Sequence, residues 1–113
     1  MARILIVEDE ALVAELLSSY LDELGHVTLG PVATVREALA LVETNLPDFS
    51  FLDLTLGRDQ CFPIADDLHR RNLPFAFTTG YGAGAIPERF KGARFLAKPY
   101  AFEEILVLLE GYK

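Results

Sequence analysis

The sequence predicts an α/β fold in which a single doubly wound parallel sheet carries helices on both faces. Short apolar segments, rich in β-branched or aromatic residues, alternate with segments whose apolar residues recur every three or four positions. Proline and glycine separate the segments, as at Gly25, Pro47 and Pro74. Strands that alternate with helices form βαβ units, which right-handed crossovers build into a parallel sheet. The length of 113 residues suits one domain spanning 1–113.

Five segments are expected to be strands, because each is short, apolar and bounded by turn residues. They are residues 4–7, 26–29, 49–52, 75–78 and 94–97, the second of which is closed by Gly30 and Pro31. Five strands favour the flavodoxin-like order 2-1-3-4-5, in which the topological switch point lies between strands 1 and 3. Ligands bind beside that point at the carboxyl ends of the strands, so the residues that follow the strands are the first candidates for a site.

Four segments carry the helical period. The first starts at Ala11, ends at Gly25 and presents one apolar face, formed by Val13, Leu16, Leu17, Tyr20 and Leu24. The second begins after Thr34, a candidate N-cap with Glu37 three positions later, and the third carries Pro63 in its first turn. The last presents an apolar face formed by Phe102, Ile105, Leu106, Leu109 and Tyr112.

The composition narrows the class of function. Seventeen acidic and ten basic residues give a net charge of -7, and such a chain repels nucleic acid. The one cysteine, Cys61, cannot form an internal disulfide, which fits a reducing cytosol. The first apolar run, residues 4–7, is shorter than the about 7–15 residues of a signal-peptide core or the about 20 of a membrane span. We therefore expect a cytoplasmic domain that does not bind nucleic acid or membranes.

Polar residues follow four of the five predicted strands. Glu8 and Asp9 follow the first strand, Asp53 the third, Thr79 the fourth and Lys98 the fifth. In a doubly wound sheet these positions meet at one edge, where Asp9 and Asp53 would lie side by side on neighbouring strands. Each strand supplies only one or two candidates, so their convergence indicates a functional site.

These residue types favour phosphoryl transfer. Three carboxylates repel one another unless a cation joins them, and hard oxygen ligands suit Mg²⁺ or Mn²⁺. Lys98 and the Thr79 hydroxyl can contact phosphoryl oxygens. Asp53 can act as the nucleophile and form an aspartyl phosphate. With an ordinary pKa of about 3.9, Asp53 would be ionised at neutral pH without a base.

Over essentially its whole length the sequence resembles a response-regulator receiver domain, CheY-like. The resemblance rests on Glu8-Asp9 in "VEDE", Asp53 in "FLDL", Thr79-Gly80 and Lys98-Pro99. It implies that Asp53 is the phosphoacceptor, that Asp9 binds the metal directly and that Glu8 does so mostly through water. It also implies metal binding by the backbone carbonyl of Thr55, a cis Lys98–Pro99 bond and an aromatic switch residue at Phe95.

A narrower likeness concerns the stretch "PFAFTTGYG", residues 74–82. It is similar to the signature of the stand-alone FAT GUY receivers, some of which act in bacterial general stress signalling, although Thr78 stands where that signature has alanine. Two roles are open for Tyr81, which either caps the edge of the core or moves with Thr79 when phosphate arrives. The glycine-rich loop that starts at Gly80 would rearrange as the added charge draws Thr79 and Lys98 inward. Gly57 stands where most receivers carry proline. The interval from Thr79 to Lys98 is also short for a receiver, so the fourth helix is expected to be reduced.

The resemblance implies a single-domain response regulator that acts in two-component or phosphorelay signalling. A histidine kinase or a histidine phosphotransfer protein would donate a phosphoryl group to Asp53. Lys113 follows the last helix directly, so no output domain is expected, and the response would pass through altered protein contacts or phosphate relay. The protein would be a monomer or a weak dimer.

Two alternative functions remain open from the residues themselves. One is a phosphohydrolase with an aspartate nucleophile, although Thr55 stands where such enzymes usually place a second acid. The other is an adaptor that keeps the fold and works without phosphorylation. Steady turnover of a phosphate ester would indicate the first, and partner binding that survives a block of phosphorylation would indicate the second.

Overall fold

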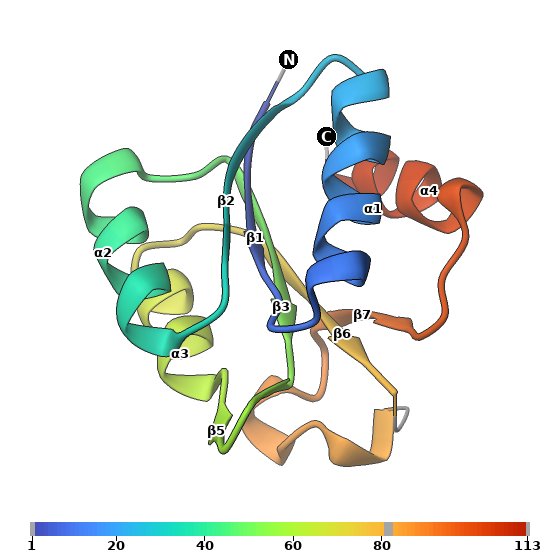
Figure 1. The fold of residues 1–113 in the computed structure, drawn as a ribbon. Helices are drawn as coiled ribbons and strands as arrows, with labels where there is room; N and C mark the ends of the chain where they lie inside the picture. The colour runs from blue at the N-terminus through green and yellow to red at the C-terminus, as the bar shows by residue number, and fades with distance from the viewer. Residues whose placement is uncertain (1, 81–82, 113) are drawn as a thin grey trace.

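The computed structural model describes residues 2–80 and 83–112. At the centre of this part of the chain lies a five-stranded parallel sheet in the order β2-β1-β3-β6-β7 (Figure 1). Its strands are β1 (Arg3–Val7), β2 (Val27–Val32), β3 (Phe49–Asp53), β6 (Phe75–Thr79) and β7 (Arg94–Ala97). Numbered within the sheet, this is the order 2-1-3-4-5, so the predicted flavodoxin-like fold is confirmed.

Two helices cover each face of the sheet (Figure 1). On one face lie α1 (Ala11–Glu23) and α4 (Phe102–Tyr112), and on the other α2 (Val35–Asn45) and α3 (Phe62–Arg70). No helix within residues 2–80 and 83–112 is long and apolar enough to cross a membrane.

The central strands are apolar throughout because both of their faces are covered. Along β1 the side chains alternate, so that Leu5 and Val7 join the core beneath α2 and α3. Ile4 and Ile6 join the core beneath α1 and α4. Burial on both sides accounts for the unbroken apolar run that predicted this strand.

The predicted N-terminus of α2 is confirmed. The Thr34 hydroxyl accepts a hydrogen bond from the backbone N–H of Glu37 at 3.1 Å and donates one to Glu37 Oε1 at 3.0 Å. The same carboxylate accepts the backbone N–H of Ala33 at 3.4 Å. Donors that the first turn leaves unpaired are therefore satisfied locally, which starts the helix at this residue.

The predicted end of the second strand was wrong. β2 continues through Gly30 and Pro31 to Val32, where its backbone carbonyl accepts the N–H of Glu8 at 2.9 Å. Gly30 permits this because its φ is +89° and a Cβ there would lie 2.8 Å from the backbone nitrogen of Val32. Proline is tolerated because β2 is an edge strand. The extension positions the backbone of Glu8, the first of the predicted site residues.

The predicted apolar face of the first helix is confirmed in part. Leu17 is buried, and Tyr20 and Leu24 pack against the same core, whereas Leu16 is 47% exposed. The other buried residues of α1 are Ala14 and Leu21, which were not predicted. Ala14 packs toward the sheet although it is small, whereas the periodicity of apolar residues had predicted that larger neighbouring residues would be buried there. In α4, by contrast, Ile105 and Leu109 are buried as predicted.

Two connections shape the edge of the sheet where the site lies. After β3 the chain forms a hairpin of β4 (Thr55–Leu56) and β5 (Asp59–Gln60), which was not predicted. Between β6 and β7 the described residues form two short 3-10 turns, η1 (Ala83–Ala85) and η2 (Glu88–Phe90), in agreement with the predicted reduction of a helix there.

Candidate functional site

The carboxyl ends of β3, β6 and β7 and the segment after β1 surround one cavity of about 370 Å³. Its lining brings together residues far apart in sequence: Asp9, Glu10, Asp53, Leu54, Thr55, Thr79, Gly80 and Lys98. The predicted convergence at one edge of the sheet is therefore observed.

The ammonium group of Lys98 lies among three carboxylates. Its Nζ is 2.8 Å from Glu8 Oε1, 3.2 Å from Asp53 Oδ2 and 3.3 Å from Glu10 Oε1. The Lys98 side chain is 16% exposed and that of Glu8 is 3% exposed. Charges so far from solvent need such partners, because an unpaired buried charge is strongly destabilising. The lysine thus supplies the positive charge that lets these carboxylates lie together.

The backbone around Lys98 holds the side chain in this position. β7 pairs with β6 in register, so that Ala97 lies opposite Thr79, and the N–H of Lys98 donates to the Thr79 carbonyl at 2.8 Å. The Lys98–Pro99 peptide bond is cis, as the resemblance implied. The lysine and the threonine therefore flank one end of the cavity from neighbouring strands.

The environment of Asp53 changes its acidity. Burial, a hydrogen bond with Glu8 and the negative charge of Glu8 raise its pKa from 3.8 to about 7, although Lys98 acts in the opposite direction. The expectation that Asp53 has an ordinary carboxyl pKa was wrong. Lys98 itself loses solvation, but its hydrogen bond to Glu8 and the charges of Asp53 and Glu8 raise its pKa, so it is cationic across the neutral range.

We expect the contribution of Asp53 to stability to fall as the pH rises from about 4 to 7 in the absence of divalent metal. The pKa of this carboxyl is raised from 3.8 to about 7 on folding, so within that window the folded state binds more protons than the unfolded chain. Asp53→Asn removes this titrating group. The free energy of unfolding of the variant, relative to that of the wild type, should therefore be about 2 kcal/mol higher at pH 8 than at pH 5. Urea denaturation in EDTA measures this gain, and an equal difference at both pH values would contradict the raised pKa.

Asp9 lies at the predicted site and makes one contact that was not predicted. Its carboxylate lines the cavity, but Oδ2 accepts the backbone N–H of Gly57 at 2.8 Å. Gly57 lies at the turn of the β4–β5 hairpin with φ +63°. Proline, which the family usually has at this position, has no N–H and could not donate this hydrogen bond. The glycine therefore accounts for how the hairpin contacts Asp9.

Glu8, Glu10 and Asp53 form a close acidic cluster, in which one carboxylate oxygen of each residue lies within 4.8 Å of the others. Glu10 was not predicted as a member of this group. The unbroken acidic run Glu8-Asp9-Glu10 was the available signal, but sequence alone did not show which way its third side chain turns. In the structure the backbone N–H of Glu10 donates to Glu8 Oε2 at 3.1 Å, which draws the two acids together.

The remaining predicted residues lie as follows. Thr79 is buried and lines the cavity together with Gly80 and Thr55. Phe95 lies on β7 opposite Phe77 and is 39% exposed. Tyr81 lies outside the described residues, and its proposed role stays a prediction.

Cys61 takes no part in this chemistry. It is fully buried, and burial together with the charge of Asp53 raises the pKa of its thiol to about 12. The reactive thiolate is therefore disfavoured.

The donor set fits Mg²⁺. Closely spaced carboxylate oxygens are hard ligands, and a site of this kind leaves other positions to water and phosphate. The pKa of Asp53 is raised chiefly by burial and further by the hydrogen bond and the negative charge of Glu8, which Lys98 offsets only in part. A divalent cation would complete that compensation, and Glu8, Asp9, Glu10 and Asp53 are the carboxylates within reach of the site.

A doubly wound sheet with an acidic cluster and a lysine at its carboxyl edge defines a receiver domain. The chain belongs to the response regulator receiver domain family, whose model matches residues 4–110. The family is a class of signalling domain, and its members are response regulators of two-component systems.

Curated relatives agree with this membership. The chain is 29% identical over 112 residues to the transcriptional regulatory protein PdtaR of Mycobacterium tuberculosis, covering 96% of this chain and 55% of PdtaR. It is 32% identical over 117 residues to the sensory transduction protein LytT of Bacillus anthracis, covering all of this chain and 48% of LytT. The chain spans about half the length of the curated relatives it matches.

Solved structures match the fold over almost the whole chain. SdrG from Sphingomonas melonis Fr1 is 36% identical with a TM-score of 0.88, covering 99% of this chain and 96% of SdrG. The non-phosphorylated HemR receiver domain from Leptospira biflexa is 30% identical with a TM-score of 0.83, covering 99% of this chain and 94% of that one. The narrower likeness to FAT GUY receivers stays a prediction.

Proposed function

We propose that Asp53 accepts a phosphoryl group from a phosphohistidine on a histidine kinase or histidine phosphotransfer protein, with Mg²⁺ bound at the acidic cluster. The observation that carries this proposal is the position of Asp53, which is 6% exposed and lies 3.2 Å from Lys98 Nζ at a cavity lined by Thr79. A nucleophilic carboxylate, a fixed cation and a hydroxyl are thus brought together at the carboxyl edge of the sheet.

The metal would be held by the carboxylates of Glu8, Asp9 and Asp53 and by the backbone carbonyl of Thr55, with Glu10 as a further ligand. When bound, Mg²⁺ would supply positive charge that lowers repulsion among the carboxylates and the phosphoryl oxygens. That charge also favours the ionised form of Asp53, which matters because the metal-free pKa of about 7 leaves much of this carboxyl protonated at neutral pH.

Asp53 performs the transfer itself. An ionised Oδ attacks phosphorus in line with the leaving imidazole, so that an O–P bond forms while the N–P bond of the phosphohistidine breaks. The electron pair of the broken bond stays with the imidazole nitrogen. The product is an aspartyl phosphate, and no residue of this chain has to remove a proton once Asp53 is ionised.

The added charge changes the contacts of Lys98 and Thr79. A phosphoryl group brings about two negative charges and three acceptor oxygens. Lys98 would exchange its contacts with Glu8 and Glu10 for a phosphoryl oxygen, and the Thr79 hydroxyl would donate to another. Gly80, Tyr81 and Phe95 would follow Thr79 and change the surface that partners contact, or the phosphoryl group would pass on to another protein.

A solved relative supports a switch of this kind. SdrG from Pseudomonas melonis Fr1, 37% identical to this chain with a TM-score of 0.83, has a BeF3-activated conformation, and the match covers 96% of this chain and 92% of SdrG. Phe95 is half exposed on β7, which leaves its ring able to change its burial in a corresponding transition.

Incubation with acetyl phosphate tests the acceptor proposal. Intact-mass measurement should show one added phosphoryl group with Mg²⁺ and at least about tenfold less in EDTA, because the cluster then lacks its divalent cation. Borohydride reduction followed by peptide mapping should place the phosphoryl group at Asp53. A modification at another residue, uptake that is equal in EDTA, or steady turnover of a phosphate ester without retained phosphate would contradict the proposal.

A further inference from the structure

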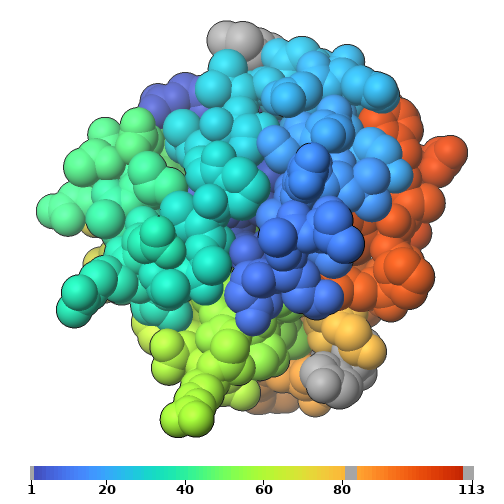
Figure 2. All heavy atoms as spheres, in the orientation of Figure 1, coloured from blue at the N-terminus to red at the C-terminus, as the bar shows by residue number. Residues whose placement is uncertain are grey.

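The β4–β5 hairpin is joined to the acidic site by a hydrogen bond from the backbone N–H of Gly57 to Asp9 Oδ2 at 2.8 Å. In Figure 2 the hairpin projects, in yellow-green, beside the blue segment that carries Asp9. Asp9 is exposed, and within residues 2–80 and 83–112 this is the one hydrogen bond that its side chain makes. An exposed carboxylate ordinarily turns among several rotamers, so this bond decides where the Asp9 carboxylate lies.

The hairpin that carries this donor is firmly anchored. Leu54, Leu56 and Cys61 are each no more than 5% exposed and belong to the core beneath α2 and α3. The N–H of Leu54 donates to the carbonyl of Thr78 on β6 at 3.0 Å, and the N–H of Cys61 donates to the carbonyl of Leu54 at 3.1 Å. Both legs of the hairpin are therefore tied to the sheet and the core, which fixes the position of Gly57 between them.

The place of Gly57 in the turn leaves its N–H available to Asp9. Leu56 pairs with Asp59 across the hairpin, so Gly57 and Arg58 are the two turn residues. The φ of Gly57 is +63°, and a glycine with positive φ at the first turn residue is typical of a type II′ hairpin turn. The hydrogen bond that closes such a turn is made by the residues that flank it, so the N–H of the first turn residue can donate elsewhere.

Gly57 acts on Asp9 from outside the cavity. The lining of the cavity of about 370 Å³ includes Asp9 and Thr55 but not Gly57. A carboxylate accepts several bonds through its two oxygens, so the hydrogen bond at Oδ2 leaves Asp9 able to bind a cation. The hairpin thus carries one candidate ligand, the backbone carbonyl of Thr55, and holds a second, the carboxylate of Asp9.

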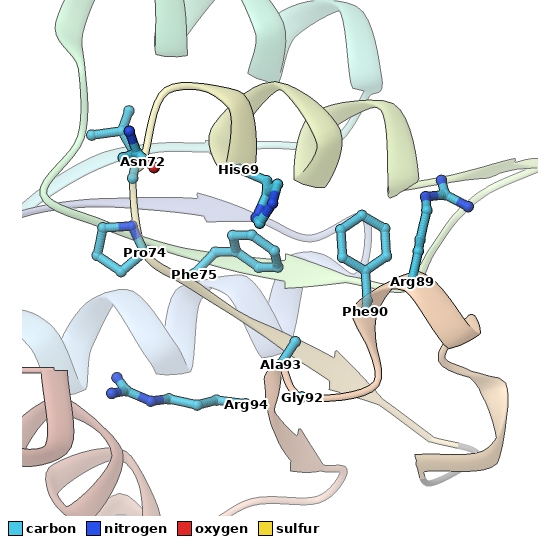
Figure 3. Close-up of a pocket in the computed structure, with 10 residues that line it drawn as sticks. His69, Asn72, Pro74, Phe75, Arg89, Phe90, Gly92, Ala93 and Arg94 are labelled. Carbon is cyan, nitrogen blue, oxygen red and sulfur yellow. The ribbon is translucent and has the colours of Figure 1, made fainter.

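Charged groups elsewhere on the protein are already paired. A hollow of about 490 Å³ lies between α3 and η2, and Arg89 is among its lining residues (Figure 3). Arg89 donates to Asp66 from Nε at 3.2 Å and from Nη2 at 3.1 Å, so this guanidinium has its own carboxylate. In the acidic cluster, by contrast, three carboxylates share the single ammonium group of Lys98. A divalent cation is therefore expected at the cluster, beside Asp9.

We propose that Gly57 is a positioning residue for the metal site: its N–H holds the Asp9 carboxylate at the cavity before a divalent cation binds. Less side-chain freedom is then lost on binding, and hydrogen bonds to ligating carboxylates raise the affinity for the metal. This role of Gly57 rests on the metal site of the proposed function, but it does not require phosphoryl transfer to Asp53.

Replacement of Gly57 by glycolic acid in a semisynthetic protein tests this role, because the ester linkage removes the N–H and adds no side chain. Titration of the unphosphorylated protein with Mn²⁺, followed by electron paramagnetic resonance, should show binding at least about fivefold weaker than to the wild type. The matched control is the ester at residue 58, made with the α-hydroxy analogue of arginine. The N–H of Arg58 donates no hydrogen bond within the described residues, so this control should bind Mn²⁺ within about twofold of the wild type.

A thermodynamic cycle with Asp9→Ala separates positioning of Asp9 from damage to the hairpin. In the Asp9→Ala background the ester at residue 57 should change the affinity for Mn²⁺ by no more than about twofold, since the carboxylate that the N–H holds is gone. A similar loss in both backgrounds would show that the hairpin itself is disturbed, and it would overturn the proposal.

Two further results would overturn the role of Gly57 alone: wild-type affinity in the ester at residue 57, or an equal loss in the ester at residue 58. If the wild type itself bound no Mn²⁺, the metal site of the proposed function would be overturned together with the role of Gly57.

Discussion

Lys98→Met is expected to lower the free energy of unfolding by about 3 kcal/mol at pH 8 in EDTA, because it leaves buried carboxylates without their cation. The ammonium group lies 2.8 Å from Glu8 and 3.2 Å from Asp53, and both acids are largely excluded from water. Methionine keeps much of the apolar stem of the side chain, so the lost stability reflects mainly the removal of the positive charge.

The same loss should shrink to about 1 kcal/mol near pH 5.5. The pKa of Asp53 is already raised to about 7 with Lys98 present, and removal of that cation raises it further. At the lower pH the folded variant therefore carries a proton on Asp53, and less unpaired charge is buried. Urea denaturation at the two pH values measures the difference.

Two controls accompany the Lys98 variant. Lys91→Met removes a lysine whose side chain is 79% exposed and should change stability by no more than about 0.5 kcal/mol. Adding Asp53→Asn to Lys98→Met should recover part of the lost stability, because one buried negative charge is removed. A loss that is the same at both pH values, or no recovery in the double variant, would show that packing and not charge explains the effect.

Asp53→Asn is expected to reduce phosphoryl uptake more than about a hundredfold, since an amide oxygen is not a nucleophile toward phosphorus under these conditions. The variant should remain folded and, at pH 8 without metal, be more stable than the wild type. Initial rates of uptake from a phosphorylated histidine phosphotransfer protein, followed by intact mass, measure the reduction.

Asp59→Asn is the matched control for this variant. Asp59 lies on β5 six residues further along the chain and is exposed, so the same chemical change is made outside the cavity. It should accept phosphate at a rate within about twofold of the wild type. If Asp53→Asn kept its uptake while Asp59→Asn lost it, the acceptor would have to be reassigned to the hairpin.

Much of the fold was predictable because local pattern and tertiary structure agree. The run Ile4 to Val7 is apolar at every position since cores lie on both sides of β1, and that burial is what its composition indicated. Thr34 and Glu37 form a local hydrogen-bonded pair that needs no distant residue. The end of β2 was missed because Gly30 and Pro31 usually mark a turn, whereas an edge strand tolerates both.

The sequence predicted which residues form the site better than it predicted how their side chains are arranged. Asp53, Thr79 and Lys98 follow three strands of one sheet, and parallel strands bring their carboxyl ends to a common edge. Asp9 lines the same cavity as Asp53, as expected, but its carboxylate also accepts the N–H of Gly57, on a hairpin that sequence periodicity did not reveal. Glu10 belongs to the acidic cluster because of the direction in which its side chain points, and residue spacing does not specify that direction.

Residue type and order along the chain determined which elements form, how the strands are arranged and which carboxylates, hydroxyl and amine reach the same edge. Apolar periodicity and strand polarity are properties of the chain itself, so they can be read before it folds. Only the tertiary structure decided that Lys98 lies among Glu8, Glu10 and Asp53 and that the pKa of Asp53 rises to about 7. Desolvation and Coulomb interactions depend on burial and on distances of a few ångströms, which exist only once distant segments have packed together.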